Sequence, residues 1–245
     1  MCGRYVSTRS PLDLATTFSA VLPDADVQLP PSWNVAPTDP VWAVLERAVE
    51  GGAVERRLRP LKWGLVPSWA KDLSGAARMI NARVETVHEK PAYRKAFAKR
   101  RCLLPADGFF EWDPVPAKDG AKAYKQPYFI SPEDGTGMAM AGLYEWWRDP
   151  AQRDDPDAWV ATCTIITTEA TDAAGRVHPR MPLAVARDDW QEWLNPAHQD
   201  IADLRALLEQ PAAGHLAVRP VSTAVNSVRN NDPSLLEPSA ADGLR

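Results

Sequence analysis

The sequence has few of the residues that cross-link a small secreted domain or hold a metal ion. It contains three cysteines, Cys2, Cys102 and Cys163, and four histidines in 245 residues. The cysteines are odd in number, lie far apart and form no Cys-x-x-Cys pair, which argues against a disulfide framework and a zinc site. We therefore expect free thiols, no metal and no cofactor.

Long apolar runs are also missing. No stretch approaches the roughly 18 apolar residues that a membrane helix requires, and the first residues lack the apolar segment of a secretory signal. The glycines do not have the spacing of a phosphate-binding loop. These absences predict a cytoplasmic protein that neither spans a membrane nor binds nucleoside triphosphates.

Proline, by contrast, is abundant, with 23 residues in the chain, so we expect short elements and many turns rather than long helices. The predicted strands do not alternate regularly with helices, which argues against a doubly wound parallel sheet. We predict an α+β fold, a single compact domain of mostly antiparallel β-sheets flanked by short helices. It should span residues 1–238, and residues 239–245 should form a disordered C-terminal tail.

Individual elements follow from local patterns. Two apolar runs flank Gly51-Gly52 and predict a hairpin, while Ser10 and Pro11 mark the start of a helix. The expected strands cover residues 41–45, 54–65, 101–104, 109–112, 128–130, 138–147, 159–167 and 218–221. The expected helices cover residues 11–20, 92–99, 188–194 and 201–209, and exposed loops are expected over residues 113–123 and 149–157.

Charge is distributed unevenly along the chain. Residues 55–102 contain 13 Lys and Arg against four Asp and Glu, although the whole chain has a formal net charge of −4. Such a segment can present a basic face to a polyanion. The alternative is that these charges are spread over a solvated surface, and charge density alone does not decide between the two.

Cys2 is notable for its position. Initiator methionine is commonly removed before a small residue, which would leave Cys2 with a thiol and a free α-amine on adjacent carbons. An α-amine has a pKa of about 7.7–8.0, so part of it is neutral near pH 7. Such an aminothiol can capture an aldehyde as an imine and then as a thiazolidine, or act as a thiol nucleophile with its own amine as base. The alternative is that Cys2 is an incidental buried residue.

Four polar residues lie in apolar or tight sequence contexts: Asn34, Asn81, Glu111 and His178. If the strand alternates, Glu111 shares a face with Phe109, so its carboxyl would be partly desolvated, with the raised pKa of a proton donor. The alternative is an edge glutamate that points to water. His178 has prolines nearby and would be a general acid or base near neutral pH, although a single histidine is more often structural.

Some of the tryptophans are interleaved in the sequence with positively charged residues. Trp33, Trp63 and Trp69 lie near Arg and Lys residues. This combination suits unstacked nucleic-acid bases, because rings stack on bases while cations hold phosphates. Most of the ten tryptophans should nevertheless be core residues.

Together these stretches resemble the SRAP family of abasic-site processing proteins, also called SOS response-associated peptidases. The resemblance includes Met1-Cys-Gly-Arg-Tyr5, Asn81-Ala-Arg-Val-Glu-Thr86 and His178-Pro-Arg-Met-Pro182. The seven matching stretches run in the family's order over residues 1–5, 33–37, 63–69, 81–86, 101–112, 178–182 and 221–228. The family's fold, a compact α+β domain with antiparallel sheets, agrees with the elements predicted above.

The resemblance implies a covalent reaction with damaged DNA. Cys2 matches the residue that links to the ring-opened aldehyde of an abasic site in single-stranded DNA, which shields the lesion in the DNA damage response. Asn81, Glu111 and His178 match the family's active-site partners. The resemblance alone does not divide the acid and base roles between Glu111 and His178.

The resemblance also implies where DNA binds. Arg4, Asn34, Trp69 and Arg83 match positions that contact the strand in the family. We therefore expect single-stranded DNA with abasic sites as the partner, no membrane or metal partner, and a monomer.

Two other functions stay open at this point. The first is an N-terminal-nucleophile cysteine hydrolase, either a peptidase or an amidotransferase-like enzyme, since amidotransferases of that class also begin with Met-Cys-Gly; lyase activity is a related alternative. The second is a noncovalent single-strand DNA-binding module that uses the basic segment over residues 55–102.

Overall fold

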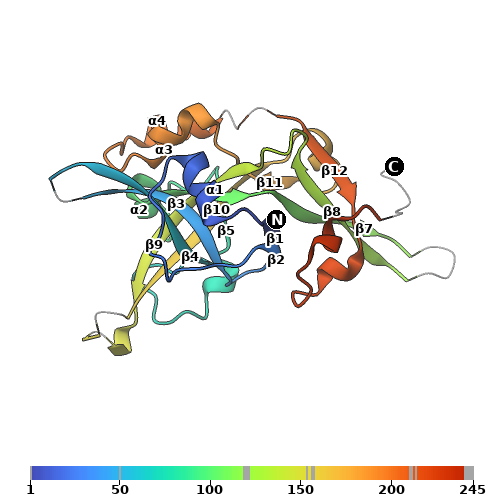
Figure 1. Ribbon diagram of the computed structural model, residues 1–245, viewed down its shortest axis with the longest axis horizontal. Coiled ribbons are helices and arrows are strands. Elements are labelled where there is room, and N and C mark those ends of the chain that lie inside the picture. Colours follow the sequence, from blue (N-terminus) through green and yellow to red (C-terminus); the bar gives the residue numbers. More distant parts are fainter. Residues whose placement is uncertain are drawn as a thin grey trace.

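Two β-sheets and four short α-helices form the protein (Figure 1). The computed structural model describes residues 2–49, 51–117, 122–152, 154–155, 158–209, 212 and 214–239. The strands are β1 (Arg4–Ser7), β2 (Ser32–Val35), β3 (Pro40–Ala48), β4 (Val54–Trp63), β5 (Asn81–Arg83), β6 (Arg101–Ala106), β7 (Gly108–Val115), β8 (Tyr124–Pro132), β9 (Met138–Arg148), β10 (Trp159–Glu169), β11 (Arg180–Pro182) and β12 (Leu216–Pro220). The α-helices are α1 (Pro11–Phe18), α2 (Arg94–Lys99), α3 (Trp190–Leu194) and α4 (Ile201–Glu209).

The larger sheet closes on itself. Its strand order is β11-β10-β4-β3-β6-β9, and β9 also pairs with β10, so five strands form a barrel. Most pairings are antiparallel, whereas β10 runs parallel to β4 and to β5. A closed barrel leaves few unpaired strand edges, and β5 and β11 extend it beside β10. The predicted α+β class with mostly antiparallel sheets is confirmed.

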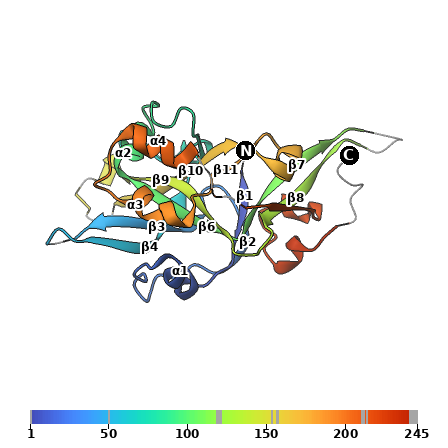
Figure 2. The same ribbon diagram turned by 90° about the horizontal axis from the view of Figure 1, so that it is seen from above.

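The second sheet has the order β12-β8-β7-β1-β2 and is antiparallel throughout. Its strand β1 lies between the barrel and the β7–β8 arm (Figure 2). Arg4 lies opposite Phe110, and Tyr5 opposite Phe109, which fixes the start of the chain against β7. The beginning of the sequence is therefore held at the junction of the two sheets.

Two of the predicted local signals act as expected. The β3–β4 hairpin pairs Ala48 with Val54, and Gly51 and Gly52 take φ values of +87° and +81°, a region that side chains disfavour. At the start of α1, the Ser10 side chain accepts a hydrogen bond from the Asp13 amide, followed by Pro11 in the first turn. The hairpin and helix α1 are confirmed.

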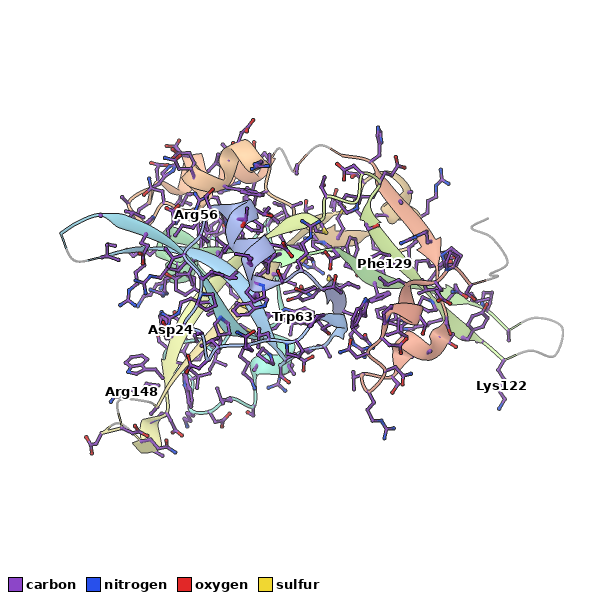
Figure 3. The ribbon with its side chains drawn as sticks, in the orientation of Figure 1. Asp24, Arg56, Trp63, Lys122, Phe129 and Arg148 are labelled. Carbon is purple, nitrogen blue, oxygen red and sulfur yellow. The ribbon has the colours of Figure 1, made fainter. Side chains whose placement is uncertain are left out.

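Apolar side chains form two main clusters around the barrel. One cluster includes Leu61, Trp63 and Cys163, together with residues of β1 and β7. Trp63 lies near the middle of the molecule, and Phe129 lies in the second sheet (Figure 3). The other cluster packs the helices against the barrel, with Phe97 of α2 and Trp193 of α3 almost fully buried.

Several element predictions differ from the structure. Strands β1, β2, β5 and β11 were not expected, because each has only three or four residues and gains its hydrogen bonds from a partner distant in sequence. The loop expected over residues 113–123 is wrong at its start, since β7 continues to Val115, which pairs with Tyr124 despite the polar residues around it. Residues 118–121, and residues 240–245 of the expected tail, lie outside the described part of the chain.

Part of the basic segment is engaged within the protein. Arg56 pairs with Glu46, Arg57 with Glu55, and Arg100 with Glu145, so three of its cations are neutralised within the protein.

Arg101 of the same segment is 2% exposed and donates only to backbone carbonyls. These five carbonyls belong to Phe97, Ala98, Trp193, Asn195 and His198. Burial lowers the pKa of Arg101 to about 10. Its guanidinium thus joins the ends of α2 and α3 to the start of β6, where a positive charge also complements the helix dipoles.

We expect Arg101→Met to reduce the free energy of unfolding by about 3 kcal/mol or more, because it leaves several buried carbonyls without donors. Lys99→Met removes an exposed cation from the same helix end and should cost less than about 0.5 kcal/mol. Urea unfolding followed by tryptophan fluorescence measures both. Equal midpoints for the two variants would contradict this role for Arg101.

Candidate functional site

Cys2 lies two residues before the start of β1 and is fully buried. Its thiol lies 3.8 Å from the carbonyl oxygen of Arg4, to which it can donate a weak hydrogen bond. Burial raises the pKa of the Cys2 thiol well above its usual value, and the nearby carboxylate of Glu111 raises it further. The thiol of Cys2 is therefore protonated at neutral pH in this structure.

Asn81 connects the barrel to the start of the chain. Its Nδ2 donates a hydrogen bond to the Cys2 carbonyl oxygen at 2.7 Å. The backbone of Asn81 pairs with Ile165 on β10, and its carbonyl accepts a hydrogen bond from the Tyr93 hydroxyl at 3.3 Å. Among the described residues, none donates to the buried Oδ1 of Asn81. The Asn81 side chain thus has its donor, Nδ2, bonded to the Cys2 carbonyl, and its acceptor, Oδ1, available beside Cys2.

Glu111 is a buried carboxyl on β7, with 3% of its surface exposed. Phe109 and Phe110 of the same strand are also fully buried, so both faces of β7 are covered at this point. Burial raises the pKa of Glu111, and the positive charge that His178 can carry opposes the rise. The expectation of a desolvated carboxyl is confirmed, and that of an edge residue in water is wrong.

His178 lies in the segment before β11, with Nδ1 4.0 Å from Oε1 of Glu111. The Arg180 amide lies 3.0 Å from the same Nδ1. The carbonyl oxygen of Arg180 lies 3.1 Å from the same Nδ1, so this nitrogen accepts from the amide or donates to the carbonyl according to the tautomer. The backbone of Arg180 therefore fixes the orientation of the imidazole.

The structure brings the four predicted active-site residues together from distant parts of the chain. Cys2 comes from the start of the second sheet and Glu111 from its strand β7, whereas Asn81 and His178 come from segments beside β10 of the barrel. Their contacts with one another are those described above, and their chemical roles stay predictions.

The residues predicted to contact DNA have different surroundings. Trp69 is 70% exposed, and Arg83 is exposed on β5 two residues after Asn81. Arg4 is half-buried, and its Nη1 donates to Oδ1 of Asn34 at 2.9 Å and to the Val225 carbonyl at 3.0 Å. Trp69 and Arg83 can meet a DNA strand as they stand, whereas Arg4 is already engaged within the protein.

Asn34 is only 3% exposed. Its Nδ2 lies within hydrogen-bond distance of the carbonyls of Val225, Ser227 and Asn230. Asn34 therefore holds the segment after β12 against β2, a role that the sequence did not indicate. Its predicted contact with DNA stays a prediction, and the amide is committed to the protein.

Arg180 was missed as a site residue. It lies in the stretch His178-Pro-Arg-Met-Pro182, and this place beside His178 was the only signal in the sequence. Its side chain, 12% exposed, reaches Glu85 in the segment after β5. Arg180 thus contacts His178 through its backbone and the Asn81 segment through its side chain.

Within the described ranges, no group of three or more His, Cys, Asp or Glu residues could hold a metal ion. In the same ranges, no helix has the length and apolar character that crossing a membrane requires.

We expect Asn34→Ala to lower the free energy of unfolding by about 2 kcal/mol or more, because buried carbonyls lose their donor. Asn34→Asp keeps the acceptor for Arg4 but removes the amide donor, so it should cost a similar amount. Folded samples of both variants should still bind single-stranded DNA, as measured by fluorescence anisotropy. A variant with unchanged unfolding and weakened DNA binding would instead identify Asn34 as a DNA contact.

The chain is similar in sequence to known proteins. The family model described as SOS response associated peptidase (SRAP) matches residues 1–228. The abasic site processing protein YoqW of Bacillus subtilis is 38% identical over 239 residues, which cover 97% of this chain and 99% of that protein. The abasic site processing protein HMCES of Gallus gallus is 33% identical over 234 residues, covering 85% of this chain and 66% of that protein.

A solved structure supports the fold. A protein from Bacteroides thetaiotaomicron superimposes with a TM-score of 0.74 over 97% of this chain and all of that chain, at 24% sequence identity. At that identity the likeness concerns the fold alone. The match of the family model to almost the whole chain, with relatives at 38% identity, shows that the chain belongs to the SRAP family.

Proposed function

We propose that this protein recognises abasic sites in single-stranded DNA and captures them covalently through Cys2 after removal of Met1. The observation that carries the proposal is the meeting of Asn81, Glu111 and His178 around Cys2, in a chain whose relatives are named for abasic-site processing. The product would be a thiazolidine that shields the lesion in the DNA damage response.

The proposed reaction begins at the α-amine. The abasic sugar opens from its hemiacetal to an aldehyde, and the amine of Cys2 adds to the carbonyl carbon. The resulting carbinolamine loses water to give an imine. The sulfur then adds to the imine carbon and the thiol proton passes to nitrogen, which closes the thiazolidine. One water leaves overall, and neither an oxidant nor a reductant is required.

The surroundings of Cys2 suit this order of events. A buried thiol must ionise before it reacts, whereas a neutral amine carries its lone pair already, so we place attack by the amine first. An N-terminal cysteine hydrolase stays the alternative function. Asn81 would hold the Cys2 carbonyl, and such positioning can lower a barrier by several kcal/mol.

We assign proton transfer to the buried pair. Glu111, whose pKa is raised by burial, would donate the proton that leaves with water. His178, whose Nδ1 lies 4.0 Å from Oε1 of Glu111, would transfer protons during opening of the sugar ring. It would then regain its proton from Glu111. This division gives each group one role that a substitution can test.

DNA binding would rely on stacking and phosphate contacts. Trp69 is exposed for stacking on a neighbouring base, and Arg83 is exposed beside Asn81 for contact with a phosphate. Because the lesion has no base to read, binding should be independent of sequence. We further propose that the protein acts as a monomer in the cytoplasm, where the buried thiols of Cys102 and Cys163 stay reduced.

The covalent step is tested by substitution of Cys2. Cys2→Ala should form no heat-stable adduct with an abasic oligonucleotide, because it lacks the sulfur atom that closes the thiazolidine ring. Its noncovalent binding to the oligonucleotide should change less than about twofold. Cys2→Ser should give an imine that borohydride traps but heat releases. Denaturing electrophoresis measures both.

Cys163→Ala serves as the control, because it removes another buried thiol and should keep the adduct. A heat-stable adduct of Cys2→Ala at the wild-type rate would refute the proposal.

The proton donor is tested by pH. With Glu111 as the acid, the single-turnover rate should fall as pH rises through its raised pKa, because the carboxyl then loses the proton it donates. Glu111→Gln retains the shape but has no acidic proton, so adduct formation should slow by about 10²–10⁴-fold and the falling limb should disappear. A falling limb that survives in Glu111→Gln would assign the titration to another group.

A further inference from the structure

The guanidinium group of Arg180 is hydrogen-bonded to two different residues. Nη1 donates to Oε1 of Glu85 at 2.5 Å, and Nη2 lies 3.2 Å from Oε2 of the same carboxylate. Nη2 also donates to the Thr167 carbonyl on β10 at 2.6 Å. A carboxylate that receives both arms of an arginine fixes the plane of the guanidinium, which a single contact does not.

The backbone of Arg180 is fixed at the same place. Arg180 is the first residue of β11 and lies opposite Glu169 of β10. Its amide lies 3.0 Å from Nδ1 of His178. The Arg180 carbonyl lies 3.1 Å from the same nitrogen, so any shift of Arg180 moves both backbone groups that orient the imidazole.

Glu85 belongs to the segment that carries Asn81. It follows β5 by two residues, and its neighbour Val84 donates its amide to the Thr167 carbonyl at 3.0 Å. The carbonyl of Thr167 thus accepts hydrogen bonds from the Asn81 segment and from Arg180. Through Glu85 and Thr167, the segments that carry Asn81 and His178 are joined.

We propose that Glu85 is a positioning residue for His178. It holds Arg180, whose backbone amide and carbonyl orient the imidazole beside Glu111. The proposal rests on the proposed function for the reaction that His178 serves, but its structural part concerns the ring of His178 alone. The Glu85 carboxylate contacts the Arg180 guanidinium, so it acts on His178 through Arg180.

Glu85 and Arg180 differ in exposure, which decides what loss of their pair does to folding. The Glu85 side chain is 46% exposed, so water and salt screen its charge, whereas the Arg180 side chain is 12% exposed and also donates to the Thr167 carbonyl. Hydrogen bonds from Arg180 lower the pKa of Glu85, so the carboxylate stays charged throughout the neutral range. Because Arg180 keeps its hydrogen bond to Thr167 when Glu85 is replaced, loss of the pair should affect the ring more than the fold.

The first measurement reads the imidazole without DNA. Glu85→Gln should change the nitrogen-15 shifts of the His178 ring, because the backbone groups of Arg180 that contact Nδ1 are displaced. Glu89→Gln, an exposed acid in the same part of the chain, should leave these shifts unchanged. Unaltered shifts in Glu85→Gln would overturn the proposal, and this result does not depend on whether the protein acts on abasic sites.

The second measurement reads the reaction. Glu85→Gln should slow adduct formation on an abasic oligonucleotide about tenfold, as expected for a misplaced group, with an unchanged unfolding midpoint. Glu85→Asp should restore part of the rate, and Arg180→Lys combined with Glu85→Gln should be no slower than the slower single variant. Independent, multiplicative losses would contradict action through Arg180.

A different outcome would reveal another role for the carboxylate. If Glu85→Gln binds undamaged single-stranded DNA more tightly and leaves the His178 shifts unchanged, Glu85 occupies the place of a phosphate on Arg180. That result would overturn the positioning role. Absence of any adduct with the wild-type protein would instead refute the proposed function and leave the nitrogen-15 measurement valid.

Discussion

The hydrogen bond from Asn81 to the Cys2 carbonyl is the contact on which the arrangement of the site depends. It joins the closed barrel to the first residues of the second sheet at 2.7 Å. Chain termini usually fray, yet here the start of the chain is paired with β7 and held by β5. A terminal amine fixed in this way loses little further entropy when it meets an aldehyde.

The site is built at a cost to stability that the surrounding structure offsets. A buried carboxyl and a buried thiol each favour their neutral forms, as the raised pKa values of Glu111 and Cys2 indicate. The barrel compensates with continuous strand pairing and a packed interior around Trp63. Buried groups with shifted pKa values are common at catalytic sites, because burial adjusts their acidity to the reaction.

Local sequence patterns predicted part of this structure. Gly51-Gly52 indicated the hairpin, Ser10 and Pro11 indicated the start of α1, and the aromatic residues before Glu111 indicated its burial. Strands β5 and β11 were missed because their hydrogen bonds come from β10, far away in sequence. Buried polar roles were missed for the same reason: the carbonyls held by Arg101 and Asn34 come together only in the folded chain, so residue composition could not distinguish these side chains from surface residues.

The central claim, that Cys2 offers an amine and a thiol together, is tested most directly by intact-mass spectrometry before and after incubation with an abasic oligonucleotide. The account predicts that the purified chain lacks Met1, and that the product mass equals protein plus oligonucleotide minus one water. A chain that retains Met1 or an acetyl group and still forms the adduct, or an adduct that keeps the water, would contradict it.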